Sequence, residues 1–385
     1  MAQNTVFHQV IKLIPRTIFS GWVRHADADR GVRTLDTWTW FGALLFGQLT
    51  GHDSIRAIER VFAQNDAAMN RLGFGPIRRS TLADANAARS LDVLEQTYEY
   101  VLARAAAVAP KTTGFRFKGD IFAMDSTTIE LCLGLCPWAR FHHGKGAAKL
   151  HTAIDIAGDL PQFAVITDGR AHDITVAREI SLGFKPGDTV LIDRGYVDYD
   201  WLSSLNENKV SFVTRTKANC RFKVLECRKT DRTRGFMADQ IISLSSLRGA
   251  RYKGTLRRIS YREPDTGKWL VFLTNNFELA TSTICALYKA RWKVELFFKT
   301  LKQNLKIKKF LGTSVNAVKS QVLVALIAYL LVQLLRLANG SSISIPDAMA
   351  VIGVMLLMKE PLARILGELP RTTRHPPPLQ LTFPL

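Results

Sequence analysis

The chain has 385 residues, of which 47% are hydrophobic and 22% are charged, so it is long enough for two or three folded domains with a sizeable core. Lysine and arginine outnumber aspartate and glutamate by 52 to 33, which gives a net charge of +19. An excess of this size indicates a polyanionic partner, with nucleic acid first and an anionic membrane surface second.

The apolar segments argue against the membrane. The longest apolar run, Val322–Val332, is too short to span a bilayer, and Gln333 and Arg336 follow it. The first nineteen residues hold no continuous apolar block ending in small residues, so we expect no signal peptide. We therefore predict a cytoplasmic protein whose five cysteines are reduced thiols.

Residues 1–110 are predicted to form a helical N-terminal domain. Apolar residues recur at helical spacing in three stretches, 38–49, 55–62 and 91–108. Arg78 and Arg79 stand just before a predicted helix start, a place where basic neighbours can bind backbone phosphate. Together with the total charge, these features predict that this domain binds DNA.

From residue 117 the hydrophobic period changes from helical to β-type. Phe117–Met124 is an apolar-rich run that is predicted to be a strand ending in Asp125, and β-prone residues continue to Leu133. Two further strands, 151–156 and 162–167, are predicted to form an antiparallel hairpin across a turn at Gly158.

A second carboxylate follows a second apolar run. Thr189–Ile192 is predicted to be a short buried strand that terminates in Asp193, in front of a loop formed by 194–196. A carboxylate at the end of a buried strand is costly unless it is paired or binds a metal ion. Helices are predicted on either side of this strand, at 173–180 and 199–206.

Residues 217–268 are strongly basic and alternate between apolar and polar side chains. This pattern predicts a small antiparallel β insertion with a turn at 265–267. A core strand is predicted on each side of the insertion, at 210–216 and 269–274.

The stretch from Tyr288 to Lys302 contains no glycine or proline and is predicted to be one helix. At about 100° per residue, its phenol, guanidinium, carboxylate and ammonium groups fall within roughly 40° of one another. Glu295 is the only acid among nine lysines and arginines between 285 and 319. A lone carboxylate on a cationic helix suits a divalent metal with other ligands elsewhere, although an ordinary Arg291–Glu295 pair is the alternative.

The remainder is predicted to be helical and then irregular. Residues 322–337 are expected to form a buried helix, and 346–369 a further helical piece. The segment 371–385, with three consecutive prolines, is expected to be extended or disordered.

The order of these elements can bring Asp125, Asp193 and Glu295 to one edge of a central mixed sheet. Three such oxygen ligands would suit two Mg²⁺ ions about 4 Å apart across a phosphate. In such a site, water or a DNA 3′-hydroxyl is the nucleophile. The sequence offers no pattern typical of a covalent nucleophile.

The same residues carry a resemblance. The segments MDSTTIEL around Asp125 and LIDRGYVD around Asp193, with Y-x-x-R-x-x-x-E-x-x-x-x-x-x-K from Tyr288 to Lys302, resemble DDE transposases of bacterial insertion sequences. More narrowly, they are similar to the insertion-sequence-four family. The intervals of 68 and 102 residues between the acids agree with this, and the second is long enough for the β insertion.

The resemblance implies an α/β fold: a ribonuclease-H-like mixed sheet with flanking helices, interrupted by the β insertion. It implies three regions, namely an N-terminal domain at 1–110 that binds transposon-end DNA, a catalytic domain at 111–340, and a C-terminal helical segment with an extended tail at 341–385. The implied reaction is cleavage at the element's ends and strand transfer into target DNA, dependent on Mg²⁺ with Mn²⁺ as a substitute. The implied assembly is a homodimer on two DNA ends, associated with the bacterial nucleoid.

The resemblance also assigns roles to residues. Asp125, Asp193 and Glu295 would hold the metal ions. Arg291 and Lys302 would grip phosphates near the cut, and Tyr288 would contact the backbone beside them. Further DNA contacts are expected from Lys145, Lys149, Lys299 and Arg194. The first two of these, with His142 and His143, are predicted to lie in a loop near Asp125, and a structural role is equally open for the two histidines.

Relatives of this kind stack an aromatic side chain of the insertion on a flipped base. Trp269 and Tyr261 are candidates, although we expect both to be core residues. Two other functions stay open: a DNA-binding regulator that has lost the chemistry, and a nuclease of the same fold without strand transfer.

Overall fold

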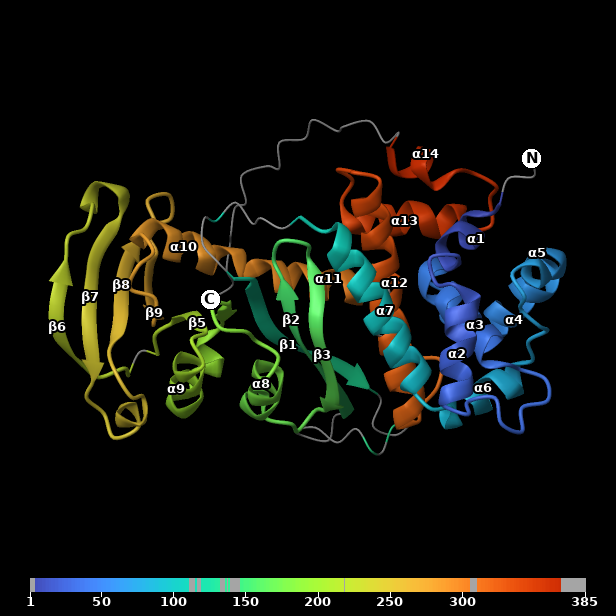
Figure 1. The fold of residues 1–385 in the computed structure, drawn as a ribbon, viewed down its shortest axis with the longest axis horizontal. Coiled ribbons are helices and arrows are strands. Elements are labelled where there is room, and N and C mark those ends of the chain that lie inside the picture. The colour runs from blue at the N-terminus through green and yellow to red at the C-terminus, as the bar shows by residue number, and fades with distance from the viewer. Residues whose placement is uncertain are drawn as a thin grey trace.

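The computed structural model describes residues 4–110, 115, 119–131, 136, 138, 146–217, 219–304 and 310–367. Within this part of the chain, nine strands form one mixed sheet in the order β3-β2-β1-β4-β5-β9-β8-β7-β6 (Figure 1). The strands are β1 Ile121–Leu131, β2 Gly146–Asp155, β3 Leu160–Asp168, β4 Thr189–Ile192, β5 Ser211–Arg215, β6 Phe222–Arg228, β7 Phe236–Leu244, β8 Leu256–Arg262 and β9 Trp269–Thr274.

The middle of the sheet is parallel and its flanks are antiparallel. β4 pairs in parallel with β1 on one side and with β5 on the other, whereas the remaining neighbours are antiparallel. The predicted hairpin is confirmed as β2 and β3, joined by a turn at 156–159.

The prediction that a strand ends at Asp125 is wrong. Asp125 is the fifth of the eleven residues of β1. The strand continues because β2 pairs with it from Phe122 to Leu131. Only the parallel pairing with β4 stops at Met124, one residue before the acid.

The predicted insertion is antiparallel, as expected, but it is not a separate sheet. Strands β6, β7 and β8 continue the central sheet through β9, which pairs with both β8 and β5. Figure 1 shows them at the end of the molecule opposite the N-terminal helices.

The N-terminal region is helical, as predicted. Its helices are α1 Val6–Ile11, α2 Arg16–His25, α3 Thr37–Thr50, α4 Ile55–Gln64, α5 Asp66–Arg71, α6 Arg79–Ala88 and α7 Asp92–Val108. Their buried side chains belong to the same hydrophobic cluster as those of α12 (Val315–Ala338) and α13 (Ile345–Met355). The domain boundaries at 110 and 340 stay a prediction.

Helix α12 is the central helix of this cluster. Its 24 residues are long and apolar enough to cross a bilayer. The prediction that this segment is too short to do so, made from the run 322–332, is therefore wrong. The helix is nevertheless mostly buried inside the protein. It is therefore a core helix here, as predicted.

The sheet is covered on both faces. Helices α8 (Asp173–Ser181) and α9 (Tyr199–Glu207) pack on one face, where Phe122, Met124 and Ile192 are buried. Helices α10 (Thr281–Ala290) and α11 (Trp292–Asn304) share the opposite cluster with Ala123 and Leu191. After α13, a short helix α14 (Leu362–Gly367) ends the described chain. The proline-rich segment 371–385 lies outside the described residues.

The single helix predicted from Tyr288 to Lys302 is interrupted at one residue. Arg291 is the C-cap of α10 and α11 begins at Trp292, although Arg291 keeps helical dihedral angles. Around it the backbone amides bond to the third preceding carbonyl, as in a 3₁₀ turn. No glycine or proline causes this tightening, which is why the sequence does not mark it.

Candidate active site

The first two acids are neighbours because of strand register. Met124 of β1 pairs in parallel with Ile192 of β4, so Asp125 and Asp193 each occupy the next position. Since successive side chains of a strand alternate between faces, both acids are assigned to the face of Ala123 and Leu191. This is the face that α10 and α11 cover.

The third acid is linked to the first through a shared cation. The guanidinium of Arg291 donates to Asp125 Oδ2 at 3.3 Å and to Glu295 Oε1 at 2.5 Å. The arginine side chain is only 13% exposed. The expected Arg291–Glu295 pair is therefore present, and the same guanidinium also contacts Asp125 of the sheet.

Tyr288 completes the contacts between these helices and the acids. Its hydroxyl lies 3.5 Å from Asp193 Oδ1, and its ring lies 5.7 Å from the Arg291 guanidinium carbon, within cation–π range. Every member of the cluster is thus joined to another by a direct contact.

The electrostatics of Asp125 reflect chiefly its burial. Burial raises the pKa of its carboxyl to about 6, and the carboxylates of Glu295 and Asp193 add to the rise. The Ser126 amide, which donates to Asp125 Oδ1 at 2.8 Å, and Arg291 lower that pKa in part. Positive charge is therefore stabilising at this position.

Comparison with known proteins identifies the family. The family described as "Transposase DDE domain" matches residues 116–331, which is more than half of the chain. The chain belongs to the DDE transposase family. Residues 2–75 match a second family, described as a domain of unknown function (DUF4372).

Three relatives of this transposase are named as transposases. One, y4zB of Sinorhizobium fredii, is 34% identical over 67% of this chain and 71% of its own length. The transposase of IS5377 from Geobacillus stearothermophilus is 30% identical over 57% of each chain. That of IS4SA from Synechocystis is 23% identical over 65% of this chain and 70% of its own. The narrower insertion-sequence-four assignment stays a prediction.

One solved structure is similar in outline. The piggyBac transposase synaptic complex with hairpin DNA aligns with 95% of this chain and 82% of its own, at a TM-score of 0.48 and 13% identity.

In this DDE transposase the three acids are not arranged as one set of metal ligands. Among the described residues, no three His, Cys, Asp or Glu side chains are grouped to hold a metal ion as they stand. The guanidinium of Arg291 instead contacts both Asp125 and Glu295. A cationic side chain of the protein itself thus lies between two of the three acids.

Three of the predicted DNA-binding cations lie near the acids in the chain. Arg194, in a 3₁₀ turn at 194–196, is exposed and directly follows Asp193. Lys299 is exposed on α11, and Lys302 is partly exposed seven residues after Glu295. The structure does not test their contact with DNA.

The placement of Lys149 in a loop is wrong. Lys149 lies in β2, opposite Thr128 of β1. Its ammonium donates to Asp173 Oδ1 and to the Ala171 carbonyl, both at 3.2 Å. Because its side chain is only 15% exposed, Lys149 contributes to the fold more directly than to a DNA surface. Lys145, His142 and His143 lie outside the described residues.

The sequence reasoning missed the polar network around Asp173. This acid opens α8 and accepts from Ser126 Oγ at 3.0 Å as well as from Lys149. Its carboxylate also lies 3.6 Å from the imidazole of His151. Burial lowers the pKa of His151 to about 4, so the ring is neutral near pH 7. The sequence indicated only one part of this network, namely that Asp173 stands at the start of a helix.

The two candidate aromatics have different surroundings. Tyr261 is partly buried against Phe236, in line with the expected core role. Trp269 is 57% exposed at the start of β9, so its expected core role is wrong. Trp269 is the first residue of β9, where the insertion ends, and its side chain therefore lies outside the packed layers.

Proposed function

We propose that this transposase binds the terminal inverted repeats of an insertion sequence, cleaves the DNA at the element's ends and joins those ends to target DNA. The observation that supports this most is that three carboxylates, 68 and 102 residues apart in the chain, are linked at one place: Arg291 bridges Asp125 and Glu295, and Asp193 lies next to Asp125 in strand register. The proposed catalytic core is ribonuclease-H-like, with the β insertion built onto its sheet.

In this proposal Asp125, Asp193 and Glu295 hold divalent cations, Mg²⁺ with Mn²⁺ as a substitute. Carboxylate oxygens are the donors that these ions prefer, and the raised pKa of Asp125 marks a position that favours added positive charge. When bound, the ions stabilise the attacking and leaving oxygens of an in-line phosphoryl transfer.

Arg291 has two successive tasks in this scheme. In the absence of DNA it forms ion pairs with Asp125 and Glu295. When the carboxylates take up their ligands, the guanidinium is released and turns to a phosphate near the cut, for which its planar fork is well suited. Lys302, Lys299 and Arg194 hold the backbone on either side, and Tyr288 positions both Asp193 and the DNA.

The helical N-terminal region is proposed to bind the transposon ends, and a homodimer to pair two of them. Such a protein works on the nucleoid in the cytoplasm. Two alternatives remain testable: a regulator that binds DNA without cutting it, and a nuclease that cuts without joining.

The decisive experiment incubates purified protein with Mg²⁺ and labelled DNA that carries one end of the element. The end is found from the short inverted repeats that flank the gene. We expect cleaved ends and, with target DNA present, joined products. Cleavage without joining would favour the nuclease, and binding without cleavage would favour the regulator.

A further inference from the structure

Two hydrogen bonds connect helix α8 to the first acid of the site through a single serine. Asp173, the first residue of α8, accepts a hydrogen bond from Ser126 Oγ at 3.0 Å. The backbone amide of the same serine donates to Asp125 Oδ1 at 2.8 Å. Since successive side chains of a strand point to opposite faces, Ser126 and Asp125 project to opposite sides of β1. Ser126 therefore connects a carboxylate on the α8 face of the sheet to a carboxylate on the face of the active site.

Strand β1 is paired on one side only where Asp125 lies. Its parallel pairing with β4 ends at Met124, so from Asp125 onward β1 pairs with β2 alone among the described strands. The next residue is Ser126, and its side chain adds a contact to a helix at this point. The contact thus falls where the backbone that carries the acid has lost one of its two neighbouring strands.

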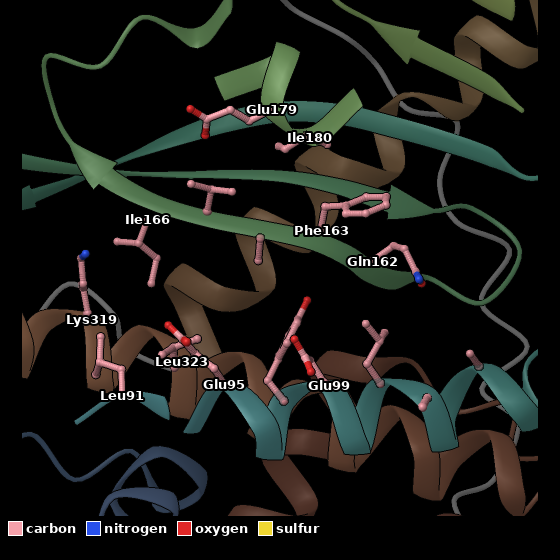
Figure 2. Close-up of a pocket in the computed structure, with 16 residues that line it drawn as sticks. Leu91, Glu95, Glu99, Gln162, Phe163, Ile166, Glu179, Ile180, Lys319 and Leu323 are labelled. Carbon is pink, nitrogen blue, oxygen red and sulfur yellow. The ribbon is translucent and has the colours of Figure 1, made fainter. Parts of the chain in front are cut away.

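Asp173 is a fixed anchor because α8 is packed firmly on the sheet. The apolar side chains of this helix are buried in a cluster against which Phe163 of β3 packs. They are Val176, Ala177 and Ile180. Figure 2 shows Ile180 of α8 on one side of β3 and the acids of α7 on the other. Asp173 can therefore move away from Ser126 only if the helix moves with it.

Two side chains of β2 restrict the orientation of the Asp173 carboxylate further. Lys149 donates to Asp173 Oδ1 at 3.2 Å, and His151 Nδ1 lies 3.6 Å from the same oxygen. His151 is itself fixed, because its side chain is 2% exposed and its Nε2 lies 3.0 Å from Thr167 Oγ1. The oxygen that accepts from Ser126 is therefore held from three directions.

Asp173 does not act as a further metal ligand beside Asp125. Its contacts with Ser126, Lys149 and His151 all lie on the α8 face, whereas Asp125 belongs to the face that α10 and α11 cover. The sheet lies between the two carboxylates. Any influence of Asp173 on the site must therefore pass through Ser126.

Ser126 holds the oxygen of Asp125 that Arg291 does not contact. The Ser126 amide donates to Oδ1, and the Arg291 guanidinium donates to Oδ2. In the proposed function the guanidinium leaves Asp125 for a DNA phosphate. The Ser126 amide is then the remaining described hydrogen-bond partner of this carboxylate, and it keeps the carboxylate oriented.

We propose that Asp173 and Ser126 are positioning residues for Asp125. The Asp173 carboxylate fixes the Ser126 hydroxyl behind the sheet, and the Ser126 amide in turn fixes the orientation of the Asp125 carboxylate in front of it. This inference rests on the proposed function, in which Asp125 holds a divalent cation. Residues that orient a metal ligand typically change metal affinity by about ten- to hundredfold when they are removed.

Mn²⁺ binding to the full-length protein without DNA, measured by electron paramagnetic resonance of the free ion, tests this proposal. Asp125→Asn removes the ligand itself and identifies the binding that belongs to this site. Ser126→Ala removes the hydroxyl and Asp173→Ala removes its acceptor, so each should weaken that binding about tenfold or more. Ser126→Thr keeps the hydroxyl, and Asp173→Asn keeps an oxygen in the place of Oδ1, so both should bind nearly as wild type does.

Thr128→Val is the matched control, because it removes a hydroxyl from the same face of β1 two residues further along. Its Mn²⁺ affinity should equal that of wild type. Melting temperatures are measured on the same preparations, since a purely structural role would lower stability without changing the Mn²⁺ affinity of the folded protein. In the cleavage assay, the Mg²⁺ concentration that gives half the maximal rate should rise in Ser126→Ala and Asp173→Ala, with binding of end DNA unchanged.

Wild-type Mn²⁺ affinity in Ser126→Ala and Asp173→Ala would overturn the proposal, even if both variants melt at a lower temperature. Equal weakening in Ser126→Thr or Thr128→Val would overturn it too, because the hydroxyl at Ser126 would then not be what matters. A wild-type protein that binds Mn²⁺ without cutting DNA would contradict the proposed function alone, and the affinities of the variants would still decide the role of Ser126. A wild-type protein that binds no Mn²⁺ would overturn both.

Discussion

Asp125 and Asp193 each follow the last paired residue of two neighbouring parallel strands, β1 and β4. The two acids are therefore fixed by backbone hydrogen bonding, which does not depend on any ligand. Glu295 is placed differently, since it is on a helix and reaches the sheet through Arg291. The site thus has a rigid pair of acids and a third whose position depends on a side-chain contact.

The first prediction concerns that third acid. Glu295→Gln should lower the cleavage rate on the order of a thousandfold or more, because it removes a negatively charged oxygen ligand, and it should leave binding of end DNA nearly unchanged. Gel-based cleavage and binding assays measure the two effects. Glu278→Gln, at an exposed acid ahead of α10, is the matched control and should cleave normally. Wild-type cleavage by the Glu295 variant would remove Glu295 from the ligand set.

The second prediction concerns Arg291 as the resident cation. Arg291→Gln should lower the melting temperature of the metal-free protein, because two nearby carboxylates lose their shared positive charge. Added Mg²⁺ should then raise the melting temperature more in the variant than in wild type, since the metal no longer competes with the guanidinium. An equal Mg²⁺ response in both proteins would contradict this competition.

Much of the architecture followed from sequence pattern. The helices, the hairpin and the insertion are local features with their own periodicity, and the order of the elements indicated that the acids converge. The position of Asp125 within β1 did not follow, because it depends on how far the pairing with β2 continues. The burial of Lys149 did not follow either, since its partner Asp173 is 24 residues away in the chain. Register and long-range partners are tertiary information that composition and periodicity do not contain.

The third prediction concerns DNA affinity. Lys302→Ala should weaken binding to end DNA and reduce the slope of log K against log salt by about one unit, because one phosphate contact is lost. Fluorescence anisotropy over a salt series measures the slope. Lys359→Ala, at an exposed lysine between α13 and α14, should leave it unchanged. A wild-type slope in the Lys302 variant would separate this lysine from phosphate.

The fourth prediction concerns pH. Burial lowers the pKa of His151 to about 4 in the folded protein, against about 6.5 when unfolded. Between these values the unfolded chain binds the proton more readily, so stability is complete above pH 6.5 and falls as the pH drops to 4. The loss should be on the order of 3 kcal/mol.

Chemical denaturation of wild type and His151→Gln between pH 4 and pH 7 checks this linkage. The variant should lose less stability over that range, because the titrating ring is gone. His172→Gln, at an exposed histidine next to Asp173, should keep the wild-type dependence. Parallel pH profiles for wild type and His151→Gln would show that His151 is not the titrating group.

The last prediction concerns how the insertion is tied to the helices of the site. Asp239 of β7 and Arg257 of β8 form an ion pair at 2.6 Å, with both side chains 2% exposed. Thr281, the first residue of α10, donates to the same carboxylate at 2.8 Å. Removing only the acid leaves a buried guanidinium without its counter-charge, so Asp239→Ala should cost about 3 to 5 kcal/mol of folding free energy.

Replacing both partners should cost less. D239M/R257M removes both charges and keeps apolar volume, so it should recover much of the stability lost in Asp239→Ala. Its cleavage activity should nevertheless stay below that of wild type, because Thr281 then lacks the carboxylate that holds the start of α10, the helix of Tyr288. Denaturation and cleavage measured on the same preparations separate the two effects. Full activity in the double variant would mean that the ion pair stabilises the fold without positioning the site.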